Sequence, residues 1–348
     1  MTLPENSSGR RGILAGGNFV VDRVKQIDCY PEQDQLALIH AESLGNGGGP
    51  YNLLKDVARI APTIPLEAIG LIGTDPLGDW ILQDCADSSI DVRQLQRTSE
   101  ALTAYTDVMS VVSTGRRTFF HQPGANSLLD EVHFNFSESN ARIFYLGYLS
   151  LLDRLDQVDG DGQTGAARVL AQARSHGMIT AADLVSGHHD RFREIVVAAA
   201  PELDYLLLNE LEAGWIVERT LRNQEGVEPD DVATTAADIL QLGVRHTVVI
   251  HYEEGAVART CQGGVYTERS LVLSEEEIQG AVGAGDAFAA GFLHGVHEEL
   301  PTEQALYQGV CCAAVCLSHP SASGGMLPLE ACLRPRTRLA DESDPQGE

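Results

Sequence analysis

Residues 280–292 read GAVGAGDAFAAGF: small residues lead into an acid, Asp286, and a helical pattern begins at that acid. Gly283 and Gly285 permit a tight turn whose backbone N–H groups point outward. The positive N-terminal end of the following helix adds to their attraction for an anion. Such amides can hold a developing phosphate charge, while the carboxylate accepts the proton of an attacking hydroxyl. The segment also suits a plain helix start capped by Asp286. No Gly-Lys-Ser/Thr follows, so it is not a Walker A loop.

Around this segment, short apolar runs typical of strands alternate with helical patterns, which predicts an α/β fold of three layers with a mainly parallel central sheet. The first strand is followed by GGNFVVD rather than G-x-G-x-x-G, which disfavours a dinucleotide-binding oxidoreductase. The predicted strands are 12–15, 66–69, 143–146, 179–183, 205–208 and 247–251, and the predicted helices are 51–60, 80–88, 165–176, 191–200, 232–242 and 286–298.

Two segments, 24–39 and 101–120, have strand-like patterns with no helix between. In the second, the period of two from Thr103 to Val111 predicts an antiparallel hairpin that turns near Gly115. Strands outside the main sheet predict a small β lid over its end, with pieces at about 22–45 and 97–122. We expect one domain over residues 11–335. The polar residues 1–10 and the acidic residues 336–348 are expected to be disordered tails.

The charge and the cysteine content of the chain narrow the classes of binding partner and the cellular compartment to expect. The chain of 348 residues carries a formal net charge of −26. A field of that sign repels nucleic acids and anionic membranes, so neither is an expected partner. It also repels ATP, so a kinase site would need a divalent cation together with amide donors. The seven cysteines form no CxxC pair, and no apolar run suits a signal peptide or a membrane span. We therefore expect reduced thiols in a cytoplasmic protein.

Five stretches in chain order resemble the motifs of one family, the ribokinase-like (PfkB) carbohydrate kinases. They are GGNFVVD (16–22), GNGGGPYN (45–52), IGLIGTDPLG (69–78), NELE (209–212) and GAGDAFAAGF (283–292). Each motif alone is weak, but five in order over about residues 12–330 argue against chance. The resemblance implies a ribokinase-like kinase domain with a β lid. It also implies an enzyme that transfers the γ-phosphoryl group of ATP to a hydroxyl of a sugar or sugar-like molecule.

The resemblance also implies roles for individual residues. Asp286 would be the general base, and Gly283, Ala284 and Gly285 would form the anion hole. Without the family context, Asp22 is a turn residue and Asn52 a helix cap. The residues implied to bind the acceptor are Asp22, Gly48, Gly49, Asn52 and Asn126.

On the nucleotide side, Asn209 and Glu212 would act near magnesium and the phosphates. A carboxylate there suits Mg²⁺, which keeps much of its water shell, so Glu212 would bind the metal through water. Without the resemblance, Glu212 is a solvated acid in the first turn of a helix. Gly255 is the remaining glycine of the T-x-G-x-x-G pattern beside ATP, and Tyr252 replaces another, where it would line the nucleotide site or crowd it.

The chain departs from the family elsewhere. Many relatives bind a monovalent cation with an aspartate six residues before the catalytic one and with a threonine two residues later. Here these positions are Gly280 and Val282, so potassium activation is in doubt. Gly49 replaces the lysine that ribokinases carry, which removes support for ribose as the substrate.

Several alternatives remain open. Arg116 and Arg117 read as a charged hairpin turn, or as a basic pair that holds an anionic substrate group. The same motifs suit a nucleoside kinase or a non-catalytic sugar- or nucleotide-binding regulator. Lid strands in this family often pair between subunits, so a homodimer through the lid is a further expectation.

Overall fold

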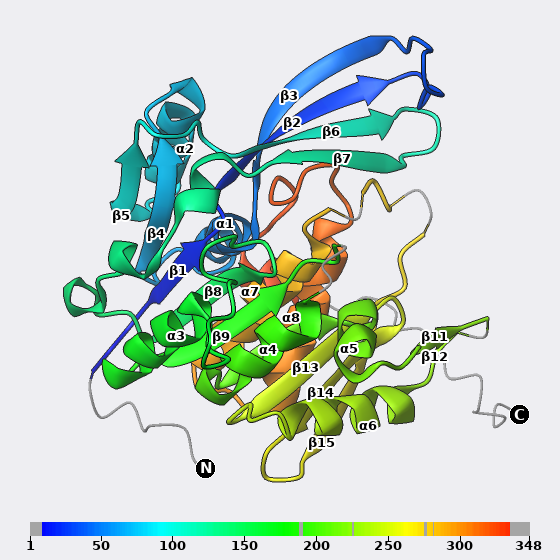
Figure 1. Ribbon diagram of the computed structural model, residues 1–348. Coiled ribbons are helices and arrows are strands. Elements are labelled where there is room, and N and C mark those ends of the chain that lie inside the picture. The colour runs from blue at the N-terminus through cyan, green and yellow to red at the C-terminus, as the bar shows by residue number, and fades with distance from the viewer. Residues whose placement is uncertain (1–8, 188–190, 225, 275–276, 281, 335–348) are drawn as a thin grey trace, which may run out of the picture.

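The computed structural model describes residues 9–187, 191–224, 226–274, 277–280 and 282–334 (Figure 1). Its largest element is a nine-stranded sheet with the order β15-β14-β13-β10-β9-β8-β1-β4-β5. The strands from β13 to β5 run parallel, and β14 and β15 add an antiparallel edge. The bounds are β1 Ile13–Gly17, β4 Leu66–Gly73, β5 Asp91–Thr98, β8 Ile143–Leu149, β9 Ile179–Leu184, β10 Tyr205–Asn209, β13 Thr247–Tyr252, β14 Gly255–Thr260 and β15 Val265–Arg269.

Helices cover both faces of this sheet. The strands β1 and β9 are buried along their whole length because they have a helical layer on each side. The helices are α1 Gly49–Ile60, α2 Pro76–Asp87, α3 Gly165–Ser175, α4 Phe192–Ala199, α5 Glu210–Val217, α6 Pro229–Leu240, α7 Ala284–His297, α8 Thr302–Cys316 and α9 Leu329–Cys332. Short 3-10 helices occupy Gly124–Leu128, Glu131–His133, Phe136–Glu138 and Ala200–Glu202, and β11 Arg222–Asn223 pairs with β12 Gly226–Val227.

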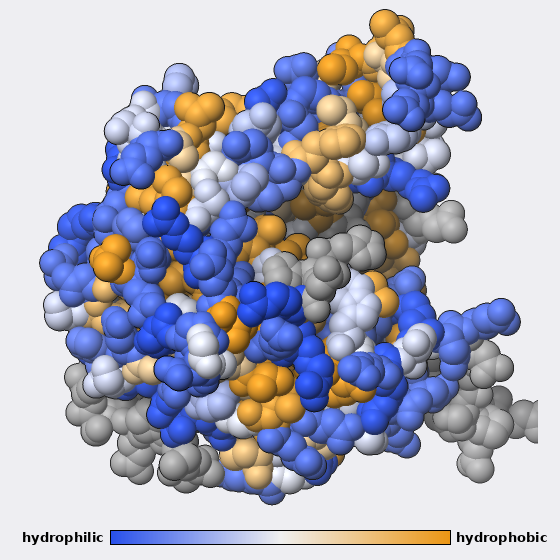
Figure 2. Space-filling view, viewed as in Figure 1, coloured by the Kyte–Doolittle hydropathy of each residue, from blue (hydrophilic) through white to orange (hydrophobic). Residues whose placement is uncertain are grey.

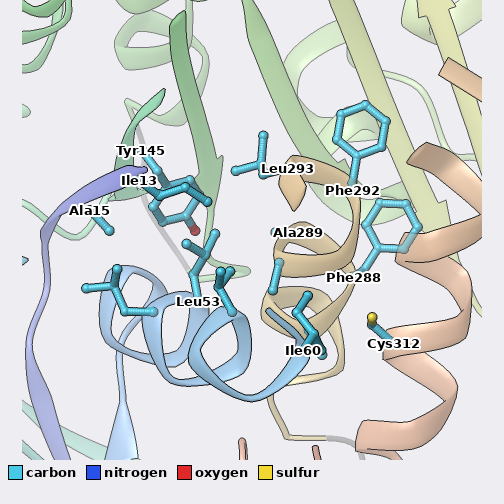
Figure 3. Close-up of a cluster of buried hydrophobic side chains, with 14 of the residues drawn as sticks. Ile13, Ala15, Leu53, Ile60, Tyr145, Phe288, Ala289, Phe292, Leu293 and Cys312 are labelled. Carbon is cyan, nitrogen blue, oxygen red and sulfur yellow. The ribbon is translucent and has the colours of Figure 1, made fainter. Parts of the chain in front are cut away.

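Two apolar clusters form the core, one on each face of the sheet. In β1, Ile13 and Ala15 face the cluster that α1, α2, α7 and α8 cover, whereas Leu14 faces the cluster under α3 to α6. This alternation follows from the period of two along a strand. Figure 3 shows the first cluster, where Leu53 of α1 and Leu293 of α7 converge on Tyr145 of the sheet.

A separate four-stranded sheet, which we call the small sheet, has the order β3-β2-β6-β7. Its strands are β2 Val20–Ile27, β3 Ile39–Gly47, β6 Tyr105–Val111 and β7 Arg117–Gln122. Because β2 begins three residues after β1 ends, the small sheet continues from the carboxyl end of β1 and projects away from the main body (Figure 1).

The structure confirms the predicted three-layer α/β fold with a mainly parallel sheet and a second sheet outside it. The hairpin turn near Gly115 joins β6 to β7 as predicted. The extended segment 24–39 is wrong as one strand, because β2 ends at Ile27 and β3 begins at Ile39. The predicted strands omitted β5, β11, β12, β14 and β15, and the predicted helices omitted α5, α8 and α9. Most of both predicted tails lies outside the described residues, but Arg10 is described and donates hydrogen bonds to the carbonyls of Ser139 and Ala141.

None of the helices in the described ranges combines the length and the apolar composition needed to cross a bilayer.

Candidate active site

A cavity of about 810 Å³ lies between the small sheet and the carboxyl ends of the parallel strands. The surface is hollowed at this place in Figure 2, below the small sheet. Strands β8, β9 and β13, the starts of α1 and α7, and one face of the small sheet contribute side chains to it. Ligand sites in open α/β sheets lie outside the carboxyl ends of the strands, so the position of this cavity makes it the candidate active site.

The start of α7 points its backbone donors into this cavity. Gly283 precedes the helix with φ 80°, a left-handed conformation that favours glycine, and no side chain caps the helix. Among the described residues, the first N–H that bonds back into this turn belongs to Ala287, which donates to the carbonyl of Gly283 at 2.8 Å. The N–H groups of 284–286 therefore lie outside the helical hydrogen-bond ladder, next to the positive end of the helix dipole. This arrangement can bind an anion.

Asp286 lies in the first turn of α7 and is only 5% exposed. The amide of Asn52 donates to Asp286 Oδ2 at 2.8 Å, and the Tyr148 hydroxyl lies 2.8 and 2.9 Å from the two carboxylate oxygens. Burial raises the pKa of Asp286 to about 6, while these two donors lower it. A carboxylate with that pKa can accept a proton near neutral pH.

Asn52 is itself held in place by further polar contacts. Its Oδ1 accepts a hydrogen bond from Asn46 at 2.7 Å, and Asn46 also donates to Ser323 Oγ at 2.9 Å. The small sheet, α1 and the segment after α8 are thus joined through side chains that end at Asp286. The network orients the carboxylate before any ligand arrives.

The small sheet contributes one face of its strands to the cavity. Asp22 comes from β2, and Arg117, Phe119 and His121 come from alternate positions of β7. Burial and the nearby Asp286 raise the pKa of Asp22 to about 7, and Arg117 counteracts this rise.

Arg117 reaches from β7 to the segment that follows α8. Its guanidinium donates to the carbonyl of Pro320, and its Nε is buried with no hydrogen-bond partner within the described part of the chain. A Cβ built on Gly280 would lie 2.7 Å from Arg117 Nη2, so a side chain at position 280 would displace the guanidinium from this place.

Asn209 and Glu212 form a capping box at the start of α5. The Asn209 side chain accepts from the N–H groups of Leu211 and Glu212, and the Asn209 N–H donates to Glu212 Oε2 at 2.9 Å. The Ser186 hydroxyl donates to Glu212 Oε1 at 2.9 Å. Glu212 is 3% exposed rather than solvated, and burial raises its pKa to about 7.

Asp183, at the end of β9, lies in the same cavity. Its Oδ1 is buried and makes no hydrogen bond of good geometry among the described residues, although the Tyr145 hydroxyl is near enough to lower its pKa. Burial and the nearby Asp286 raise the pKa of Asp183 well above its usual value. A buried carboxylate oxygen beside Glu212 is the type of ligand that Mg²⁺ prefers, so these side chains fit a magnesium ion bound with nucleotide phosphates. In the described ranges, no group of three or more His, Cys, Asp or Glu side chains is arranged to hold a metal ion by itself.

The structure brings most of the expected site residues together. Those that line the cavity are Asp22, Gly48, Asn52, Asn209, Glu212, Gly283, Gly285 and Asp286. Ala284 lies next to the lining residues, in the first turn of α7.

Four expected residues lie elsewhere. Gly49 packs beneath the ring of Tyr148, and Asn126 is buried in the 3-10 helix Gly124–Leu128, where it donates to the carbonyl of Phe19. Gly255 begins β14 outside the cavity. Tyr252 neither lines nor crowds the cavity, because its side chain packs into the core under α3 to α6.

The cavity residues missed in the sequence include three with titratable side chains at strand ends, Tyr148, Asp183 and His251. All three lie at the carboxyl end of a parallel strand, and that position is a signal that the sequence offered for Asp183 and His251, which end predicted strands. His251 packs on Phe288, and burial lowers its pKa to about 4, so its ring is neutral.

Comparison with known proteins identifies the family and supports the fold. A family model described as pfkB family carbohydrate kinase matches residues 16–329. A 5-dehydro-2-deoxygluconokinase of Geobacillus thermodenitrificans is 23% identical over 295 residues, which cover 82% of each chain. Adenosine kinase 1 of Arabidopsis thaliana is 25% identical over 288 residues, which cover 79% of this chain and 78% of the relative. The ribokinase of Arabidopsis thaliana, solved with ribose and ATP, matches with a TM-score of 0.74 and 18% identity over 93% of this chain and 98% of its own.

Proposed function

The chain belongs to the pfkB family of carbohydrate kinases, and on that premise we propose that it transfers the γ-phosphoryl group of ATP to a hydroxyl of a sugar or sugar-like molecule with Asp286 as the general base. One observation carries the proposal. A buried carboxylate with a pKa of about 6 opens into a cavity beside the backbone N–H groups of the first turn of α7, which lie outside the helical hydrogen-bond ladder. Phosphoryl transfer needs these two groups together, a proton acceptor for the hydroxyl and donors for the phosphate charge.

The residues divide the work by position. Asp286 takes the proton of the acceptor hydroxyl as that oxygen attacks phosphorus. The N–H groups at the start of α7 hold the charge that develops on the phosphoryl oxygens, with Gly283 and Gly285 leaving their approach open. Asn52 fixes the direction in which the carboxylate faces. On the acceptor side, Asp22 and the backbone at Gly48 bind the other hydroxyls of the substrate.

ATP and magnesium bind on the other side of Asp286. Asp183 and Glu212 would hold the ion, Glu212 through water, and Asn209 would contribute from the start of α5. When bound, the ion neutralises the phosphate charge that the acidic chain would otherwise repel.

Arg117 is the one arginine or lysine among the described residues that line the cavity. Its Nε, which is unpaired among the described residues, offers a charged donor in a site that otherwise holds four carboxyl groups. We assign it a role in binding an anionic group, which favours the basic-residue interpretation of Arg117 over a plain turn.

The acceptor is either a sugar derivative or a nucleoside. The match to 5-dehydro-2-deoxygluconokinases favours a sugar acid, and the match to adenosine kinase supports a nucleoside as the second candidate. ADP release with magnesium and ATP, measured over a panel of sugars, sugar acids and nucleosides, tests the proposal. Turnover of at least one acceptor is expected. Thermal stabilisation by sugars or ATP without ADP release from any of them would instead favour a non-catalytic regulator.

We also propose that the enzyme needs no potassium. The guanidinium of Arg117 lies against Gly280, in the space that a side chain at position 280 would occupy. The same screen with and without potassium chloride, at constant ionic strength, checks this point: equal turnover is expected, and strong activation by potassium would contradict it.

A homodimer through the small sheet is supported by its surface. Ile39 and Leu44 on edge strand β3, and Phe119 and Phe120 on edge strand β7, are 47–53% exposed. Light scattering after size exclusion should give twice the mass of the chain, and Ile39→Lys, which places a charge on the unpaired edge, should give the mass of one chain.

A further inference from the structure

The hydroxyl of Tyr148 lies directly on the base. It is 2.8 Å from Asp286 Oδ1 and 2.9 Å from Oδ2, and Asn52 occupies a further position on Oδ2. Tyr148 also lines the cavity, so its hydroxyl stands where an acceptor reaches Asp286. Hydroxyl donors compete for the same lone pairs of the carboxylate.

The structure holds Tyr148 in this place from two sides. Its backbone N–H donates to Asn18 Oδ1 at 2.7 Å, and Asn18 donates in turn to the carbonyl of Leu151 at 2.9 Å. Its ring lies over Gly49: a Cβ built on Gly49 would be 2.8 Å from Tyr148 Cε1. The lack of a side chain at position 49 thus makes room for the tyrosine ring.

Asp286 needs such a donor because its surroundings oppose its negative charge. It is buried, and no lysine or arginine is paired with it in the described ranges. A buried carboxylate among other acids takes up a proton unless donors favour the ionised form. The titratable groups around it are Asp22 of β2, Asp56 of α1, Tyr145 and Tyr148 of β8, Asp183 of β9, His251 of β13 and Cys316 of α8, and the nearest cation of the cavity, Arg117 of β7, acts on Asp22.

We propose that Tyr148 is a positioning residue for the base: its hydroxyl keeps the Asp286 carboxylate ionised and closed to water until the acceptor hydroxyl takes over one oxygen. The inference rests on the proposed role of Asp286. It goes beyond that role because it explains how the site would avoid transferring phosphate to water, which is the smallest hydroxyl acceptor.

Tyr148→Phe tests the inference, because phenylalanine keeps the ring over Gly49 and removes only the hydroxyl. The matched control is Tyr51→Phe, which removes another buried tyrosine hydroxyl, bonded to Asp84 Oδ2 at 2.5 Å and outside the cavity. The first readout is the titration of the Asp286 carboxyl carbon by NMR of protein labelled at aspartate, assigned with Asp286→Asn. In Tyr148→Phe its midpoint should rise by about one pH unit, the effect of one charge-assisted hydrogen bond.

The second readout is ADP release from magnesium ATP without an acceptor, at pH 8, where the base is ionised in both proteins. This rate should rise about tenfold in Tyr148→Phe, because water then reaches Asp286 without first breaking the hydrogen bond from Tyr148. The rate should stay unchanged in Tyr51→Phe. Gly49→Ala displaces the same ring and should reproduce both effects.

The two readouts separate this inference from the proposed reaction. The NMR titration uses neither ATP nor acceptor, so a raised midpoint in a protein that phosphorylates nothing would support the Tyr148 contact and refute the kinase reaction. An active enzyme whose Tyr148→Phe variant keeps the wild-type midpoint and the wild-type ADP release would overturn the role of Tyr148.

Discussion

The two sheets of this molecule meet at one cavity, but they are built differently. In the nine-stranded sheet, β1 and β9 have every residue buried between helices. In the small sheet, the first six residues of β3 are exposed, and so are the last four of β7. The main body therefore carries the stability of the fold and positions Asp286, Tyr148 and Asp183. The small sheet supplies Asp22 and Arg117 while burying little apolar surface.

This difference predicts how substitutions should divide. Substitutions at Asp286 and at the start of α7 should lower either kcat or the free energy of unfolding, because these residues belong to the main body. Changes on the cavity face of the small sheet should alter binding and leave the free energy of unfolding almost unchanged.

The largest effect is expected for Asp286→Asn. Removing the general base should lower kcat by about 10²- to 10⁴-fold. The fold should not weaken, because a neutral amide replaces a buried acid. ADP release and the thermal midpoint measure the two effects, with Asp161→Asn, an exposed aspartate, as the control. Turnover near that of the wild type would remove Asp286 from the mechanism.

Arg117→Ala should have the next largest effect. If Arg117 binds an anionic group, kcat/KM should fall about 10- to 100-fold, as for a lost charge-assisted hydrogen bond. The thermal midpoint should hardly change, since the small sheet contributes little stability. Arg116→Ala is the matched control, because Arg116 is exposed on the same hairpin. Equal losses in both variants would show only a loss of general positive charge.

Gly283→Ala, a change in the main body, should lower the free energy of unfolding. Left-handed backbone costs a residue with a side chain about 1–2 kcal/mol. At Gly283 the new Cβ would also lie 2.8 Å from the Cα and carbonyl oxygen of Ala322. Gly263→Ala is the control, since Gly263 has φ 91° and no neighbour within 4 Å of a built Cβ. Urea denaturation should show the larger loss for Gly283, and equal losses would mean that the loop at Ala322 yields freely.

The smallest effect concerns pH and the buried acids. Both carboxyl oxygens of Asp56 are buried, and this burial raises its pKa well above 3.8, although the Ser323 hydroxyl acts in the opposite direction. A group whose pKa is higher in the folded state contributes stability below its unfolded pKa and loses that contribution as pH rises through the folded value. Asp22, Asp286 and Glu212, with pKa values of about 7, 6 and 7, act in the same direction.

The free energy of unfolding should therefore fall between pH 4 and pH 8. Asp56→Asn should make this fall shallower, and the exposed Asp87→Asn should not. Urea midpoints at several pH values measure the slope. An unchanged slope in Asp56→Asn would mean that this carboxyl is not protonated in the folded protein.

Local sequence patterns predicted the elements of the main body well, because each depends on neighbours only a few residues away. The helix at 51–60 and the strand at 179–183 follow from periodicity. The capping box at Asn209 and Glu212 is also local, although the sequence did not reveal that Glu212 is buried. Strands β14 and β15 were missed, because an antiparallel edge after a run of strand–helix units breaks the alternation on which the prediction relied.

The sequence alone determined the three-layer fold, the glycine turn before α7 and the acid that follows it. These features depend on the periodicity of strands and helices and on the backbone freedom of glycine, which are properties of residues adjacent in the chain. Tertiary structure decided which side chains meet that acid. Two side chains contact Asp286 from far away in the chain: Tyr148, which is 138 positions from it, and Asn52, which is 234 positions from it. Arg117 likewise reaches Pro320, which is 203 positions away. The physical reason is the order of the strands. Because β1 lies beside β8 in the sheet but far from it in the chain, residues with no local relation converge at one edge.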